Sequence, residues 1–443
     1  MRTNLFQTMT MAGLAWAASG LPALADTGYL QTNLVASDAS YNPTFGVDPN
    51  VINPWGIALR PPGAGGHIWL SNAGTGTTTT YIGDANGVPL FQDGLKVIPI
   101  ITSARDMDLF ETGSDQVANV TGQVYNAASD IPGQPVEFPV SGPAVNFKTD
   151  PPTSVGIDSG SSKFVFVTLD GTINAWRTGT NPAMVEAVVI KDYSQNYASI
   201  GLDKFPSYAG VGMTTDAFTT DGQGNKIADN RLYAADFANG RIQVFDNQWN
   251  DITEPTKFQR PADLPITYHP FNVQVLSDNR VYVVWAENAL EIDDPTEEIP
   301  GPGFGRVVAY DRHGNMLQDY SQHSTLNAPW GIAIAPSDFG PFSNALLVAN
   351  FGDGTIAGFD LVSGAELGYL KDPDGNVISI EGIWGLTFGN GVMLGDLNAL
   401  YFTAGVSEER NGLFGSLRLV PEPATFSLLA TGGMLLIGRR RRI

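Results

Sequence analysis

The stretch of sequence that decides the fold runs from residue 230 to residue 246 and reads NRLYAADFANGRIQVFD. Apolar and polar side chains alternate on both sides of Asn239-Gly240, a dipeptide that is among the strongest local signals for a β-hairpin. The pattern therefore predicts two antiparallel strands joined by a tight turn. Two other stretches follow the same plan, at residues 163–176 with a turn at Asp170-Gly171 and at residues 345–359 with a turn at Asp353-Gly354.

The strand that precedes each hairpin also repeats, and in most copies it places a large apolar residue before glycine. The equivalent positions are Trp55, Val211, Phe271, Trp330 and Trp384. The last four are spaced by 60, 59 and 54 residues, whereas 156 residues separate the first two. This long gap hides one further repeat and an insertion, and the hidden repeat starts at 120–125, which we prefer, or at 153–157. Either choice gives six repeats.

The period and the turn chemistry predict one all-β domain. Four-stranded units that repeat at this spacing pack radially into a β-propeller. The last repeat supplies only three strands, at 382–388, 399–403 and 413–419, and residues 29–35 are the best candidate for its missing outer strand. We therefore expect an NHL-like, six-bladed β-propeller over residues 26–419, closed by an N-terminal strand that completes the last blade.

Composition excludes several classes of function. The 443 residues contain 50 glycines and 29 prolines, which favours short strands and turns over long helices. The chain has no cysteine, which rules out disulfides, thiolate nucleophiles and zinc–thiolate sites. The 45 acidic residues outnumber the 24 basic ones and give a net charge of −21. Such a chain repels phosphate backbones, so nucleic acid is not an expected partner.

Both ends of the chain have the composition of targeting segments. Residues 1–25 join a basic start, a short apolar stretch and the small residues Ala23 and Ala25, which predicts a secretory signal peptide cleaved after Ala25. A short N-terminal membrane anchor is the less favoured alternative. Residues 420–443 hold Pro421-Glu422-Pro423, an apolar segment and four arginines. That segment would extend about 22 Å as a helix against a bilayer core of about 30 Å, so a permanent tail anchor is also less favoured.

These segments and the repeats resemble known families. The tail, through Pro421-Glu422-Pro423 and its basic end, resembles the PEP-CTERM sorting signals of Gram-negative bacteria, and residues 230–246 closely resemble an NHL repeat. From about residue 34 to residue 419 the chain resembles an uncharacterised family of secreted bacterial propeller proteins. The resemblance to this propeller family is carried by residues 51–58, 170–173, 326–331, 350–354 and 383–386.

The resemblance implies an exported protein and no particular reaction. It implies that an exosortase recognises and removes the tail, after transient contact of the C-terminal segment with the inner membrane. The protein would then reach the cell surface or the extracellular matrix, where an extracellular polysaccharide or a surface protein would be its partner. The resemblance supplies no catalytic residue and no cofactor.

Four aromatic residues are candidates for ligand binding. Trp55, Phe271, Trp330 and Trp384 begin the innermost strands, so they could surround one mouth of the central channel and stack on a sugar or a peptide. His269 precedes Phe271 by two positions and would lie close to the same opening. Large aromatic side chains also fill the wedge between blades, and the glycine that follows each tryptophan favours this packing interpretation.

One acidic insertion is a candidate metal site. Residues 287–298 carry six carboxylates, of which Asp293, Asp294, Glu297 and Glu298 are the closest together. Hard cations such as Ca²⁺ need several oxygen ligands that converge from one loop or from adjacent loops. The spacing fits no defined calcium loop, so a solvated acidic loop is the favoured interpretation.

The sequence leaves two functions open. We favour a non-enzymatic binding module at the cell surface or in the matrix, because none of the four histidines lies in a catalytic motif and no cysteine is present. The alternative is a calcium-dependent hydrolase or lactonase of the same propeller architecture. Fold alone cannot separate the two, because one propeller scaffold supports many functions.

Overall fold

The computed structural model describes residues 27–420, except for 62–64, 103–117, 131–134, 147, 150, 179–182, 196, 221, 225, 291–295 and 321–324. Nearly every regular element in this part of the chain is a β-strand, so the all-β prediction is confirmed. The helices are short 3-10 turns: η1 (Ala39–Tyr41), η2 (Ala73–Thr75), η3 (Ala127–Asp130), η4 (Tyr197–Ile200) and η5 (Gly340–Phe342). No helix among the described residues is long and apolar enough to cross a bilayer.

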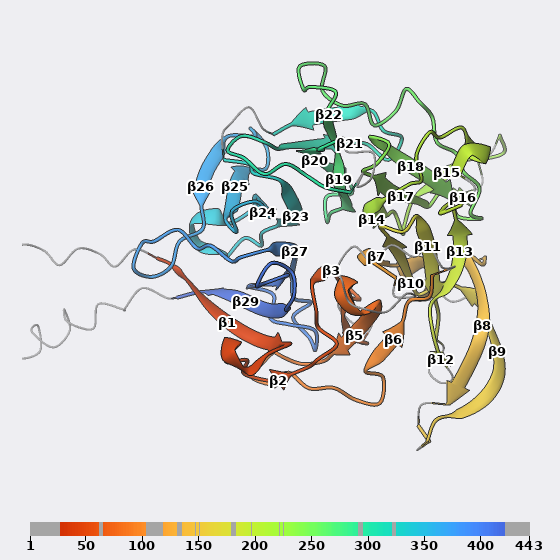
Figure 1. The fold of residues 1–443 in the computed structure, drawn as a ribbon, viewed down its shortest axis with the longest axis horizontal. Coiled ribbons are helices and arrows are strands. Elements are labelled where there is room, and N and C mark those ends of the chain that lie inside the picture. The colour runs from red at the N-terminus through yellow and green to blue at the C-terminus, as the bar shows by residue number, and fades with distance from the viewer. Residues whose placement is uncertain are drawn as a thin grey trace, which may run out of the picture. The chain divides into compact units, whose positions relative to one another are not determined.

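Six sheets of three to five strands account for most of the chain (Figure 1). The first contains β3 (Pro54–Ala58), β4 (Ile68–Asn72), β5 (Thr77–Tyr81) and β6 (Val97–Pro99), and the second contains β7 (Val120–Tyr125), β10 (Phe164–Thr168), β11 (Thr172–Trp176) and β13 (Val188–Asp192). The third contains β14 (Tyr208–Met213), β17 (Arg231–Asp236) and β18 (Arg241–Asp246), and the fourth contains β19 (Tyr268–Val275), β20 (Val281–Glu287), β21 (Arg306–Tyr310) and β22 (Met316–Asp319). The fifth contains β23 (Pro329–Ile334), β24 (Ala345–Asn350), β25 (Ile356–Asp360) and β26 (Glu366–Tyr369), and the sixth contains β27 (Ile383–Phe388), β28 (Ala399–Ala404), β29 (Leu413–Leu419), β1 (Tyr29–Ala36) and β2 (Gly46–Val47).

Two smaller sheets are insertions. One contains β8 (Pro139–Asn146), β9 (Thr153–Ser161) and β12 (Ala183–Met184), and the other is the hairpin of β15 (Phe218–Thr220) and β16 (Lys226–Ala228). Residues 153–157 therefore lie in an inserted strand. Residues 120–125, the preferred start of the hidden repeat, form the first strand of the second sheet.

The hairpin predicted within residues 230–246 forms at that position. β17 and β18 pair in continuous register from Arg231↔Asp246 to Asp236↔Arg241. Gly240 has a φ of 65°, a conformation that glycine adopts without steric cost. The Asp236 carboxylate closes the turn by accepting hydrogen bonds from the backbone N–H of Asn239 (3.2 Å) and from its side-chain amide (3.0 Å). Local turn chemistry thus sets the register of this pair.

The first strands of the six sheets contact one another in cyclic order. β3 contacts β7, β7 contacts β14, β14 contacts β19, β19 contacts β23, β23 contacts β27, and β27 contacts β3. In Figure 1 these strands lie inward of the later strands of their own sheets. Central strands such as β10 and β24 are buried along their whole length, because each sheet is covered on both faces by its neighbours.

The N-terminal strand joins the last sheet. β1 pairs antiparallel with β29 over seven residue pairs, from Tyr29↔Leu419 to Ala36↔Leu413, with a bulge between Asn33 and Val35. The Tyr29 hydroxyl also donates a 2.7 Å hydrogen bond to the carbonyl of Phe339, which belongs to the fifth repeat. The strand is therefore held by its neighbour in the sheet and by the adjacent sheet.

The predicted targeting segments cannot be placed. Residues 1–26 and 421–443, including the cleavage-site residues Ala23 and Ala25 and the motif Pro421-Glu422-Pro423, lie outside the described residues.

Candidate functional site

The four predicted aromatic residues lie together at one end of the space between the first strands, which we call the central channel. The rings of Trp55 and Trp384 stack with centroids 3.6 Å apart, and Trp330 meets Trp55 edge-on at 5.7 Å. Phe271 approaches both Trp55 and Trp384 from its own strand. All four residues are at most 4% exposed. The aromatic cluster, as we call these four residues, therefore packs on itself and closes this end of the channel.

The cluster leaves no ring face open to a ligand in this structure. The second face of Trp384 is covered by Phe351, whose ring centroid lies 4.0 Å away. The indole N–H of Trp330 donates to the carbonyl of Ala209 (2.9 Å), and that of Trp384 donates to Oδ1 of Asn53 (3.0 Å). This placement favours the packing interpretation over stacking on a sugar or peptide.

The glycines that follow the aromatic residues allow neighbouring first strands to pack closely against one another. A Cβ on Gly331 would overlap the carbonyl oxygen of Trp384, and a Cβ on Gly385 would lie 2.6 Å from the carbonyl oxygen of Trp55. A Cβ on Gly56 would lie 2.9 Å from the carbonyl oxygen of Thr121. Real Cβ atoms do not approach oxygen this closely, so the aromatic–glycine pairs of the sequence are a requirement of strand packing around the channel.

A partly buried carboxyl group lies beside the aromatic cluster. The side-chain amide of Asn53 donates a 2.6 Å hydrogen bond to Glu409, and the same amide accepts from Trp384. Glu409 ends a turn in which Ser407, Glu408 and Glu409 all have positive φ, between 54° and 64°. Burial raises the pKa of the Glu409 carboxyl to about 7. The sequence analysis missed this residue, because its burial depends on a contact with a segment 356 positions away.

The raised pKa of Glu409 predicts a pH-dependent stability. The folded protein holds the proton up to about pH 7, whereas an unfolded glutamate releases it near its ordinary value of 4.5. Glu409 therefore contributes up to about 3 kcal/mol to the free energy of unfolding below pH 4.5, and most of this contribution is lost as the pH rises from 4.5 to 7. Urea unfolding at a series of pH values measures this slope.

Two variants assign the slope to Glu409. The Glu409→Gln variant carries a neutral side chain of the same shape and should lose the slope between pH 4.5 and pH 7. The Glu408→Gln variant changes the exposed neighbour in the same turn and should keep it. An unchanged slope in Glu409→Gln would show that other groups cause it.

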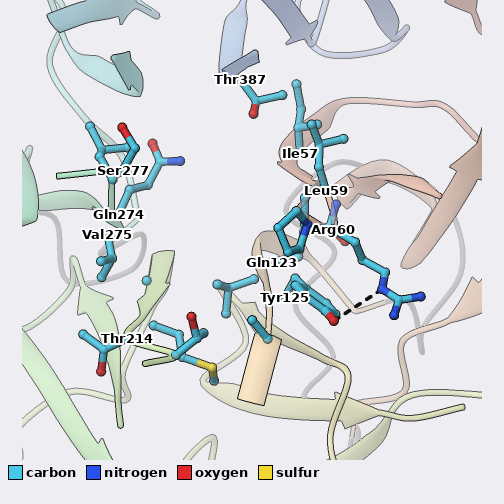
Figure 2. Close-up of a pocket in the computed structure, with 18 of the residues that line it drawn as sticks. Ile57, Leu59, Arg60, Gln123, Tyr125, Thr214, Gln274, Val275, Ser277 and Thr387 are labelled. Atoms are coloured by element: carbon cyan, nitrogen blue, oxygen red, sulfur yellow. Dashed lines mark hydrogen bonds between the residues drawn. The ribbon is translucent and has the colours of Figure 1, made fainter. Parts of the chain in front are cut away.

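The opposite end of the channel is open. A cavity of about 470 Å³ lies where the first strands β3, β7, β14, β19 and β27 end (Figure 2). This volume is within the range of small-molecule sites. Between the cavity and the aromatic cluster the channel narrows to a gap of about 10 Å³ beside Trp330. We call this open-end cavity the channel-mouth cavity.

Amide and hydroxyl groups from different sheets face the channel-mouth cavity. Figure 2 shows the side chains of Gln274 and Thr387 projecting toward it from two different sides. Oε1 of Gln274 accepts a 3.1 Å hydrogen bond from the backbone N–H of Ile332, which fixes the amide and orients its NH₂ group toward the cavity. Ser277 lies at the rim beside Gln274, and apolar side chains such as Ile57 and Leu59 form the facing wall.

Two further polar residues hold the cavity wall in place. Nε2 of Gln123 donates to the carbonyls of Gly56 (2.9 Å) and Trp69 (2.7 Å), so it ties the second sheet to the first. Nε of Arg60 donates to the hydroxyl of Tyr125 at 3.3 Å, and its guanidinium lies over the Tyr125 ring. These contacts preorganise the wall before any ligand is bound.

The charge of the channel-mouth cavity is balanced. Among its described lining residues, Arg60 is the only basic one and Asp216 the only acidic one, and none is a histidine. The remaining polar groups are amides, hydroxyls and backbone. This set of groups fits an uncharged polar molecule better than an ion.

The remaining predicted site residues lie elsewhere. Nδ1 of His269 donates a 2.6 Å hydrogen bond to the carbonyl of Phe237, and burial lowers the pKa of the ring. His269 is therefore a neutral side chain that helps to pack the aromatic end, and the described lining of the channel-mouth cavity does not include it.

The acidic insertion is only partly described. Asp293 and Asp294 lie outside the described residues. Glu297 and Glu298 are described, and Glu298 forms an isolated antiparallel β-bridge with Asn288. Within the part of the chain that the structure describes, no group of three or more His, Asp or Glu residues is arranged to hold a metal ion. The calcium site at Asp293, Asp294, Glu297 and Glu298 stays an untested prediction.

Comparisons with known proteins find relatives without an established activity. No protein-family model matches the chain. It is 28% identical over 372 residues to uncharacterized protein R648 of Acanthamoeba polyphaga mimivirus, covering 84% of this chain and 76% of the viral protein. It is 31% identical over 244 residues to uncharacterized protein R640 of the same virus, covering 53% of this chain and 40% of the other.

Solved structures with a similar arrangement are more distant in sequence. A glucose dehydrogenase aligns over 87% of this chain and 98% of its own, with 12% identity and a TM-score of 0.45. A soluble aldose sugar dehydrogenase from Escherichia coli aligns over 88% and 99%, with 12% identity and a TM-score of 0.43. A gluconolactonase from Xanthomonas campestris aligns over 58% and 82%, with 15% identity and a TM-score of 0.31. At these scores the likeness carries no argument about function.

The comparisons correct one expectation. The sequence resemblance assigned the chain to a family of secreted bacterial propellers with a PEP-CTERM tail. That assignment is wrong, because the curated relatives are mimivirus proteins and no family model supports a sorting signal. The stretches that carried the two resemblances, within residues 51–386 and in the tail, were too short to support a family assignment. An exosortase partner loses the support of that resemblance.

Proposed function

We propose that this chain is a ligand-binding protein whose site is the channel-mouth cavity, and that its ligand is a small uncharged polar molecule such as a monosaccharide or a sugar lactone. The observation that carries the proposal is the asymmetry of the channel. One end is filled by the aromatic cluster, while the other opens into a cavity of about 470 Å³ with fixed polar groups.

We also infer that the six sheets are the blades of one closed propeller. The cyclic contacts of β3, β7, β14, β19, β23 and β27 support this arrangement, since each first strand meets the first strand of the next sheet. The pairing of β1 with β29 supports closure through both chain ends. A closed ring places the ends of five first strands around one opening, which is how residues far apart in the sequence come to line one cavity.

The chemistry of the cavity supports a sugar-like ligand. A monosaccharide ring has hydroxyl groups at its edge and C–H groups on its faces. The amide of Gln274 and the hydroxyls of Thr387 and Ser277 can hydrogen-bond the edge, while Ile57 and Leu59 offer apolar contact to a face. The balance of Arg60 against Asp216 leaves the cavity without a strong preference for an ion.

A calcium-dependent hydrolase or lactonase is the second candidate. Catalysis would need a base or a metal ion in the cavity, and Asp216 is its one described carboxylate. Turnover of gluconolactone that requires added Ca²⁺ would favour this candidate over binding alone.

Blocking the cavity is expected to weaken ligand binding without unfolding the protein. Thr387 points into the cavity from β27, so a Thr387→Trp variant fills it. The matched control is Thr220→Trp in the exposed hairpin β15–β16. Isothermal titration with a panel of neutral monosaccharides and lactones should give at least one binder. The Kd of that binder should rise by about tenfold or more in Thr387→Trp and stay unchanged in Thr220→Trp.

Two results would contradict the proposal. One is a panel in which no neutral sugar or lactone binds to the wild type, and the other is equal binding by wild type and Thr387→Trp. Thermal unfolding of both variants gives the control for folding, because a variant that melts with the wild type has kept its fold.

Export of the protein stays a prediction. It depends on residues 1–25, and those residues are outside the described part of the chain. A polysaccharide or surface-protein partner would follow from export, and the proposed sugar-like ligand is consistent with the first of these. Detection of the mature N-terminus at Asp26 in secreted material would test it.

A further inference from the structure

One side-chain amide at the channel-mouth cavity has its orientation set by the donors around it. Oε1 of Gln274 on β19 accepts the 3.1 Å hydrogen bond from the backbone N–H of Ile332 on β23. Nδ2 of Asn272 lies 3.5 Å from the same oxygen and donates to the carbonyl of Trp330 at 2.9 Å. Both groups that face this end of the amide are donors, so the oxygen of Gln274 lies there and its NH₂ group lies on the other side.

The orientation of Asn272 is fixed as well. Its Oδ1 accepts a 2.8 Å hydrogen bond from the backbone N–H of Val273, and the residue is only 1% exposed. A Cβ on Gly210 would overlap this oxygen, so the neighbouring first strand β14 packs directly on the Asn272 amide. Neither amide can turn over without placing a donor against a donor. The series of hydrogen bonds therefore starts at the backbone and ends at the NH₂ group of Gln274.

This NH₂ group has no protein acceptor within the described part of the chain. The hydrogen bonds of the Gln274 side chain among those residues all involve its oxygen, and Figure 2 shows the half-buried side chain projecting toward the cavity. An NH₂ group can only donate, so a ligand has to offer an acceptor at this place. A carbonyl oxygen fits best, because it has two lone pairs and no hydrogen. An ammonium group would face the NH₂ group donor to donor.

Asp216 gives the same cavity a group of the opposite kind. Its exposed carboxylate lines the cavity, from the segment that follows β14, and it can only accept hydrogen bonds. Ring hydroxyls of a sugar can donate to it. The cavity thus combines a group that only donates with a group that only accepts, and this pairing selects ligands by the polarity of their hydrogen-bonding groups.

We propose that Gln274 is a specificity-determining residue of the channel-mouth cavity, and that the ligand is a hydroxylated ring that carries a carbonyl oxygen, such as a sugar lactone or an N-acetylated sugar. The carbonyl oxygen accepts from the NH₂ group of Gln274, and a ring hydroxyl donates to Asp216. This inference rests on the proposed function, because it concerns the same cavity. It narrows the ligand from uncharged polar molecules in general to those with a carbonyl acceptor.

Matched probes test the inference by isothermal titration of the wild type. Freshly dissolved glucono-1,5-lactone is compared with 1,5-anhydroglucitol, which lacks the carbonyl, and N-acetylglucosamine is compared with glucose. In at least one pair the probe with the carbonyl should bind about tenfold more tightly than its partner. The pair that shows the preference distinguishes a lactone from an N-acetyl group as the source of the carbonyl. This comparison needs no variant, so it holds even if a substituted chain does not fold.

Gln274→Glu reverses the polarity of the contact without changing its shape. One carboxylate oxygen still accepts from Ile332, whereas the other turns an acceptor toward the cavity. The preferred carbonyl probe should bind about tenfold more weakly, and glucosamine, whose ammonium group only donates, should bind more tightly than it does to the wild type. Asn279→Asp is the matched control, because Asn279 is exposed, lines the same cavity and gains the same charge by the same kind of change. It should keep the carbonyl preference.

Three results would overturn the inference. Equal binding within both pairs by the wild type would do so and would leave the proposed function standing, because the probes would still bind. A loss of the carbonyl preference in Asn279→Asp as large as in Gln274→Glu would also do so, since added charge alone would then explain it. Absence of binding by every probe would overturn the proposed function together with the inference.

Discussion

Deletion of residues 27–36 is expected to lower the melting temperature by about 10 °C or more. The deletion removes β1, and with it a seven-pair ladder to β29 and the buried side chains of Tyr29, Leu34 and Val35. Each fully buried side chain of this kind contributes about 1.5 to 3 kcal/mol, and each kcal/mol corresponds to about 2 °C in a large domain. The deletion also leaves β29 as an open sheet edge. Thermal unfolding followed by circular dichroism measures the effect.

Point variants keep this prediction testable if the deleted chain does not fold. Val35 is fully buried, so Val35→Ala should lower the free energy of unfolding by about 2 kcal/mol. Leu30 is 57% exposed, so Leu30→Ala should lower it by less than about 0.5 kcal/mol. The natural chain has no cysteine, so a Thr32→Cys/Ser416→Cys pair reports the pairing directly. Failure of these two cysteines to cross-link would contradict the β1–β29 register.

Gly331→Ala is expected to destabilise the protein more than Gly385→Ala or Gly56→Ala does. Its Cβ would overlap the backbone carbonyl of Trp384, which cannot move aside as a flexible side chain would. We expect a loss of about 3 kcal/mol or more in the free energy of unfolding. Gly385→Ala and Gly56→Ala should follow in that order, because their nearest carbonyl oxygens would lie at 2.6 and 2.9 Å. Guanidinium unfolding gives the ranking.

The control for this series is Gly222→Ala. Gly222 lies at an exposed turn where an added Cβ meets nothing within 4 Å. The free energy of unfolding of Gly222→Ala should therefore differ from that of the wild type by less than about 1 kcal/mol, in either direction. If Gly331→Ala were as stable as Gly222→Ala, the first strands could not be packed around the channel as closely as described.

The sequence predicted the parts of the fold that depend on local chemistry. The Asn239-Gly240 turn sits between β17 and β18 because glycine supplies the positive φ and Asp236 closes the loop. The aromatic–glycine pairs lie at equivalent places in the first strands, because a Cβ at these glycines would collide with a backbone carbonyl oxygen of the neighbouring first strand. The sequence also favoured packing of the aromatic rings, but it could not identify the residues that they pack against, because those come from other repeats.

The candidate site was beyond local analysis. Gln274 and Thr387 are ordinary polar residues at the ends of two strands, and they belong to no motif. They share a cavity because the strands that carry them contact their neighbours in cyclic order. Glu409 shows the same limit, since its contact with Asn53 joins the two ends of the domain. The sequence analysis therefore chose the aromatic end of the channel, whereas the cavity lies at the other.

We propose that the channel-mouth cavity is the ligand site, and a crystal structure of the protein with the neutral sugar or lactone that binds most tightly in the calorimetric panel would show the ligand's position. We expect electron density for the ligand at the open end of the channel, within hydrogen-bond distance of Gln274 and Thr387. Density for the ligand at any other place, with only water in the channel-mouth cavity, would contradict it.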